Sequence, residues 1–165
     1  MLSRISNRLN SITEAVCCIF LLAMTLTVAL QVICRYLLGA ALTWSEEFAR
    51  YGLVWITFLG GSVAVKRGAH MGVEALLNAL SPKVRKMVQL FTLLCVMGFL
   101  VIATIKGGQL ALFNMKQHSP AMGVPMGLVY FAIPTGCLIM LIHAAQELIA
   151  LLRRSLVEEP GEIID

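Results

Sequence analysis

The stretch AVCCIFLLAMTLTVALQVIC, from Ala15 to Cys34, is a run of 20 residues without a charge. A helix of this length rises about 30 Å, which is the thickness of the hydrocarbon core of a bilayer. Arg4 and Arg8 precede the run, but it is longer than the apolar part of a signal peptide, and no clear small-residue cleavage motif ends it. We therefore expect an uncleaved first membrane span.

The composition of the whole chain agrees with a membrane protein. The 165 residues are 59% hydrophobic and 13% charged, whereas a soluble domain is about half apolar and about a quarter charged. A water-soluble fold of this length could not bury so much apolar surface. The net charge of +4 is spread between the apolar runs, which argues against a nucleic-acid-binding face.

A second span is expected from Trp44 to about Lys66. Thr43 and Glu46, at its start, have the spacing of a capping box, in which each side chain bonds the backbone amide of the other residue. Arg67 and Gly68 follow Lys66 and suit a helix C-terminus, with cations at the negative end of the dipole and then a glycine.

A third span is expected after Ser81-Pro82, which has the pattern of a helix start. This span is charge-free from Met87 to Ile105. A helical pattern is compatible with extension past Gly107-Gly108 toward Met115. Such an extension would be kinked at the glycines or would project from the membrane.

The fourth span is expected from about Met126 to Glu147, with its helix reaching Arg154 and bending at Pro134. The segment before it, Gln117 to Gly127, is rich in proline and glycine and predicts a turn.

The fold class expected is an all-α membrane protein with four transmembrane helices and a short amphipathic interfacial helix. That short helix is Met71 to Leu80, between the second and third spans, where apolar residues share one face. Residues 1–155 would form a single transmembrane domain, and residues 156–165 a disordered acidic cytoplasmic tail.

The lysines and arginines predict the orientation of the spans. Nine lie at the N-terminus, the second-to-third connection and the C-terminus, and four lie on the opposite side. Cytoplasmic loops carry the excess of these residues. We therefore expect a protein of a bacterial inner membrane with both termini on the cytoplasmic side. The segments around Trp44 and Ser119-Pro120 would then face outward.

The start of the second span carries the first candidate functional group. Its carboxylates and cation can meet at helical spacing, Glu46 with Arg50 at i,i+4 and Glu47 with Arg50 at i,i+3. Its aromatic residues form a stripe at spacings of 4, 3 and 4; they are Trp44, Phe48, Tyr51 and Trp55. A docking face with a structural role is favoured over a proton-handling site, because acids at a helix start and interfacial aromatic residues are also common.

Other candidates lie at the ends of the spans. Arg35, followed by Tyr36, could pair with Glu46 or Glu47 across a short loop, or could extend to the interface alone. His70 follows a basic helix end and could bind a partner or anionic lipid headgroups, or be an ordinary loop residue. A rigid outer turn that could dock a partner is suggested by Gln117, Ser119, Pro120, Pro125 and Tyr130.

The sequence shows no sign of an enzyme. The five cysteines lie in apolar stretches without metal-ligand spacing, and no nucleophile–base pair or phosphate loop appears. We expect no catalytic residue, no cofactor and no metal. A self-sufficient ion-coupled carrier would show a polar site at mid-membrane or an inverted repeat, and neither is seen.

In order and spacing, these residues resemble the small permease subunit of TRAP (tripartite ATP-independent periplasmic) transporters, the DctQ-like family, in its unfused form. The first match is Arg35-Tyr36, then Trp44-x-Glu46-Glu47-x-x-Arg50-Tyr51 with Trp55, Phe58-Leu59-Gly60, Ala64 and His70. The second match is Gln117-x-Ser119-Pro120-x-x-x-x-Pro125 with Tyr130 and Pro134.

The resemblance implies a heterodimer with a large permease and transient contact with a periplasmic substrate-binding protein. The small subunit would scaffold the large one for sodium-coupled uptake of organic anions, such as dicarboxylates or sugar acids like sialic acid. Substrate and sodium sites would lie in the large subunit, so Glu46, Glu47 and Arg50 would be contact or fold residues. The alternatives are an autonomous small carrier or channel, and a membrane haem or redox subunit.

Overall fold

The computed structural model describes residues 2–39, 42–67 and 81–158. Within them the chain is helical, apart from its turns and an isolated bridge between His118 and Pro125. The helices are α1 (Leu2–Leu37), α2 (Thr43–Lys66), α4 (Pro82–Phe113), η1 (Asn114–Lys116), α5 (Met126–Tyr130) and α6 (Ala132–Glu158).

Four helical stretches of the described residues are long and apolar enough to cross a membrane, namely Ser6–Leu37, Thr43–Lys66, Val84–Lys116 and Met126–Arg153. The third combines α4 with η1, and the fourth combines α5 with α6. This confirms the expected all-α architecture with four spans. The Met71–Leu80 segment, expected to be an interfacial helix, and the last residues of the acidic tail lie outside the described residues.

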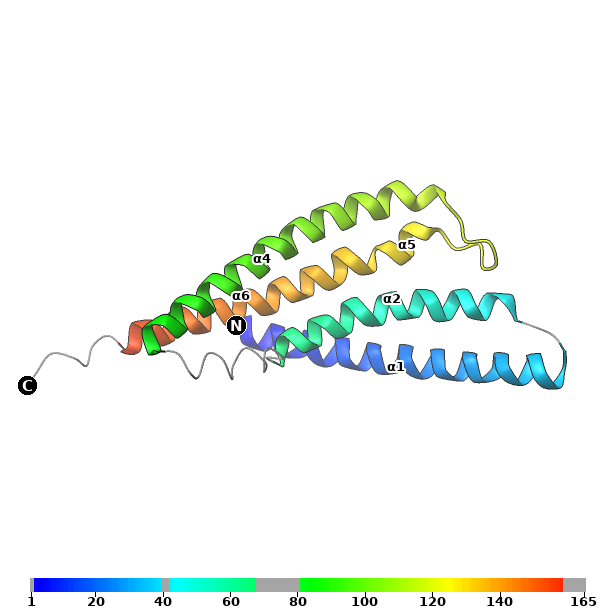
Figure 1. Cartoon of the computed structure of the whole chain (residues 1–165), viewed down its shortest axis with the longest axis horizontal. Coiled ribbons are helices and arrows are strands. Elements are labelled where there is room, and N and C mark those ends of the chain that lie inside the picture. The colour runs from blue at the N-terminus through cyan, green and yellow to red at the C-terminus, as the bar shows by residue number, and fades with distance from the viewer. Residues whose placement is uncertain (1, 40–41, 68–80, 159–165) are drawn as a thin grey trace, which may run out of the picture.

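Figure 1 shows the long helices as two hairpins, α1 with α2 and α4 with α6. We call one end of the molecule the loop end, where α2 begins and the 117–125 turn lies. The other is the terminal end, where α1 begins and α6 finishes. Neighbouring helices pack in the order α1, α2, α6, α4. Because α1 and α4 are the outer members of this row, most of their bulky apolar side chains are exposed.

The helix boundaries correct one prediction. The capping box at Thr43 and Glu46 does not form, because α2 starts one residue early and Leu42 occupies the cap position without a side-chain hydrogen bond. The Ser45 hydroxyl donates to the Leu42 carbonyl at 2.6 Å instead. At its other end, α2 finishes at Lys66 with Arg67 as its cap residue, as expected.

The third and fourth spans follow the predicted pattern. Pro82 opens α4 behind Ser81, and α4 continues through Gly107-Gly108 as far as Phe113. The fourth span is divided at Phe131 into α5 and α6. Pro134 has no N–H to donate to the carbonyl four residues earlier, which accounts for a break at this position.

Small residues allow the helices to approach closely. A Cβ atom built on Gly136 of α6 would lie 2.6 Å from the Cβ of Phe58 on α2, and one built on Gly107 of α4 would lie 2.6 Å from Ile133. Gly127 faces the carbonyl of Ala111. Close packing of this kind drives association in lipid, where apolar burial between helices gives little gain.

Polar side chains join three helices at the terminal end. The buried Ser6 hydroxyl of α1 lies 2.7 Å from Nδ1 of His143 on α6, and Lys66 of α2 donates to Gln146 of α6 at 2.6 Å. Arg67 forms an ion pair with Glu14 at 2.8 Å. No local sequence pattern points to these contacts, because their members are far apart in the chain.

Candidate functional site

Glu47 holds the outer turn to the second helix. It is only 7% exposed, and its carboxylate accepts a hydrogen bond from the Ala121 amide at 3.1 Å and from the Met122 amide at 3.0 Å. The Ala121 amide donates to Oε1 and the Met122 amide to Oε2, so both oxygens of the carboxylate are bonded. Hydrogen bonds to an ionised acceptor are stronger than those between neutral groups, so this contact anchors the turn to α2.

The turn has a compact hydrogen-bonded structure of its own. The Ser119 amide donates to the Val124 carbonyl at 2.9 Å, and the Ser119 hydroxyl accepts from the Val124 amide at 3.2 Å. Gly123 has φ of 65°, a conformation that glycine adopts readily. The Gln117 carbonyl accepts from the Met126 amide at 2.7 Å. The backbone bonds of Ser119 and Gln117 therefore hold the two sides of the turn together.

The charged residues beside Glu47 do not pair as the sequence suggested. Glu46 accepts a hydrogen bond from Gln31 of α1 at 3.1 Å. Across the described ranges, Arg67 with Glu14 is the one ion pair within 4.0 Å. Neither Arg35 nor Arg50 therefore forms an ion pair this close with Glu46 or Glu47, although the charge of Arg50 still acts on Glu47. Glu46 joins α1 to α2, whereas Glu47 joins α2 to the turn.

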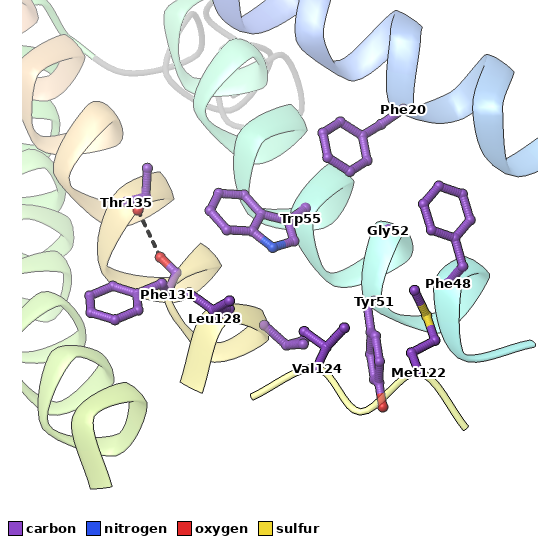
Figure 2. Close-up of a pocket in the computed structure, with 11 residues that line it drawn as sticks. Phe20, Phe48, Tyr51, Gly52, Trp55, Met122, Val124, Leu128, Phe131 and Thr135 are labelled. Atoms are coloured by element: carbon purple, nitrogen blue, oxygen red, sulfur yellow. Dashed lines mark hydrogen bonds between the residues drawn. The ribbon is translucent and has the colours of Figure 1, made fainter. Parts of the chain in front are cut away.

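The aromatic residues of α2 line an open groove of about 580 Å³ (Figure 2). Its walls come from α1, α2, the turn and the α5–α6 segment. The lining includes Phe20, Phe48, Tyr51, Trp55, Leu128 and Phe131. The predicted stripe is thus brought together for three of its four members; Trp44, which is 41% exposed, is not part of the lining.

The remaining candidates occupy separate positions. Tyr36 is 80% exposed at the end of α1, and Pro120 is exposed on the turn. Pro125 is the cap residue of α5, and Tyr130 ends that helix. His70 lies outside the described residues.

Among the described residues, no group of three or more histidines, cysteines, aspartates or glutamates could hold a metal ion. The polar side chains described above bond helices or turns of the same chain. Together with four membrane-crossing helices, this arrangement is typical of a multi-pass membrane protein whose polar groups maintain its own architecture.

Comparison with known proteins identifies the family. The model of the DctQ component of tripartite ATP-independent periplasmic transporters matches residues 24–154, and the chain belongs to this family. Its members are transporter components and not enzymes, which confirms both the resemblance noted in the sequence and the expectation that the chain is not an enzyme.

Curated proteins similar to this chain are also named as permease proteins of TRAP transporters. The chain is 36% identical to the ectoine TRAP transporter small permease protein TeaB of Halomonas elongata, over 72% of this chain and 62% of the relative. It is 23% identical to the sialic acid TRAP transporter small permease protein SiaQ of Vibrio cholerae, over 95% and 91%. It is also 35% identical to part of the sialic acid TRAP transporter permease protein SiaT of Haemophilus influenzae, over 42% and 12%.

Proposed function

We propose that this chain is the small membrane subunit that scaffolds a large permease in a TRAP transporter. A periplasmic binding protein would deliver an organic anion, such as a dicarboxylate or a sugar acid, and sodium would drive its uptake. Both termini would be cytoplasmic. The names of the relatives support transport of a small organic solute, since one is named for ectoine and another for sialic acid.

The open row of helices is the observation that carries this proposal. In the described part of the chain, α4 packs along α6 and α5, while α1 packs along α2 and meets α6 less extensively. A row of this kind does not enclose a polar path across the membrane. It presents broad apolar surfaces, which suit a scaffold that lies between lipid and a larger subunit.

The same geometry supports a role for the outer turn. Glu47 holds residues 121 and 122 close to the start of α2, and Pro120 is exposed beside them on the same hydrogen-bonded turn. We expect the turn to meet either the large permease or the binding protein. Both carboxylate oxygens of Glu47 are engaged by backbone amides of the turn, which argues for a structural role and against proton handling by Glu47.

The test is co-purification followed by reconstitution. A tagged chain expressed together with its cognate large permease should yield a stable complex. Liposomes with both subunits and the binding protein should accumulate solute in response to a sodium gradient. Liposomes with the small chain alone should not. Uptake by the small chain alone would favour an autonomous carrier, and a Soret absorption band in the pure chain would favour a haem subunit.

The substrate is best sought on the binding protein. The melting temperature of the cognate binding protein can be measured with dicarboxylates, sialic acid and ectoine in turn. Only one class of these compounds should raise it. Stabilisation by ectoine but by no anion of the panel would reject the organic-anion assignment, and would leave the scaffold role intact.

A further inference from the structure

The aromatic groove contains two hydrogen-bond donors without acceptors. Within the described residues, neither the indole N–H of Trp55 nor the hydroxyl of Tyr51 has a hydrogen-bond partner. Neither of these two polar atoms is a fully buried atom that lacks a hydrogen bond, so a bound molecule can reach both. The Thr135 hydroxyl, in contrast, donates to the Phe131 carbonyl at 2.7 Å. Figure 2 shows Trp55 facing the groove between α2 and the α5–α6 segment, with the Tyr51 hydroxyl at the rim near the turn.

These two donors lie at the depth where a bilayer changes from polar to apolar. The charge-free part of α2 begins at Tyr51, and Trp55 is about 6 Å deeper, since four residues rise 1.5 Å each. Tyrosine and tryptophan are favoured at this level because one end of the ring system is apolar and the other can bond polar groups. The groove therefore joins a polar rim to an apolar interior.

The walls of the groove argue against a closely packed protein helix as its occupant. Helices in membranes pack against small residues, whereas this groove is walled largely by bulky side chains, among them the aromatic rings of Phe20, Phe48 and Trp55. A flexible acyl chain has no such restriction.

We propose that the groove holds one glycerophospholipid from the leaflet next to the 117–125 turn. Its acyl chain lies against the rings of α1, α2 and Phe131 between α5 and α6, and an ester carbonyl accepts a hydrogen bond from Trp55 Nε1 or from the Tyr51 hydroxyl. The lipid fills the space between the two hairpins at the loop end. There it complements the contact of Glu47 with the turn.

Fluorescence quenching tests where the lipid lies. The chain has two tryptophans, so W44F leaves Trp55 as the single emitter and W55F leaves Trp44. In nanodiscs of phosphatidylethanolamine brominated near the ester, Trp55 emission should be strongly quenched, and the quenching should persist when the large permease is bound. No quenching of Trp55, or loss of quenching on permease binding, would show that protein fills the groove and would overturn the proposal.

Lipid retention tests the hydrogen bonds. Native mass spectrometry of the full chain in mild detergent should show one tightly retained phospholipid. Y51F keeps the ring and removes only the donor, whereas W55F also replaces the indole with a phenyl ring. The variant that lacks the bonded donor should show retention weakened about five-fold, as expected for the loss of one hydrogen bond. Y36F, at an exposed tyrosine outside the groove, should retain lipid as the unmodified chain does. Equal retention in all three variants would reject the assigned contacts.

Discussion

Replacement of Gly136 by alanine should force the two hairpins apart. The added Cβ would lie 2.6 Å from the Cβ of Phe58, 2.8 Å from its carbonyl oxygen and 2.9 Å from its carbonyl carbon. Carbon atoms pack best at about 3.5 to 4.0 Å, so α2 and α6 must separate by about 1 Å. The atoms that oppose the new methyl include backbone, which cannot rotate away.

The cost can be isolated with a matched glycine. Gly60 lies within α2 and has no atom within 4 Å of its Cβ position. Both G136A and G60A gain helix propensity, worth about 1 kcal/mol each, so their difference reports packing alone. Overpacking of a tight site costs about 1–3 kcal/mol, which for a chain of this size is a Tm difference of about 2 to 12 °C.

The assay is thermal unfolding of the two purified variants in the same detergent, followed by circular dichroism. G136A should melt below G60A by that margin and should give a lower yield of complex with the large permease. Equal melting temperatures would refute the reasoning, because they would mean that α2 and α6 do not make the close contact described at Phe58.

Three further substitutions test other contacts. S6A removes the partner of a buried histidine nitrogen and should cost about 1–3 kcal/mol of unfolding free energy, whereas S11A, at an exposed serine, should be nearly neutral; equal Tm values would contradict the contact. E47Q should speed hydrogen exchange at the two turn amides that Glu47 accepts from, and E46Q should leave that exchange unchanged. Charge reversal at Glu46 and Arg50 together should give additive losses of complex yield, and mutual rescue would show a direct pair that the structure lacks.

The helical elements were predictable because their signals are local. Ser81-Pro82 marked the start of the third span, and Pro134 marked the interruption of the fourth. The capping box at Thr43 was a wrong prediction for an instructive reason. Spacing alone cannot show which of several nearby residues becomes the cap, and in the structure Ser45 bonds the cap carbonyl of Leu42.

The candidate residues were found more readily than their partners. Glu46 and Glu47 were singled out together, yet they serve different contacts, one with Gln31 and the other with the turn. On a helix, adjacent residues point about 100° apart, so neighbours in sequence face different elements. The family resemblance indicated that these positions matter, but it did not indicate what each one touches.

The sequence by itself determined the number and position of the membrane spans. Long uncharged runs leave few alternatives in lipid, because a helix satisfies every backbone polar group within its own segment. Tertiary structure decided which side chains meet. Glu47 and Ala121 are 74 residues apart, and Ser6 and His143 are 137 apart. No local pattern specifies such pairs, because they depend on how closely small residues such as Gly136 let the helices approach.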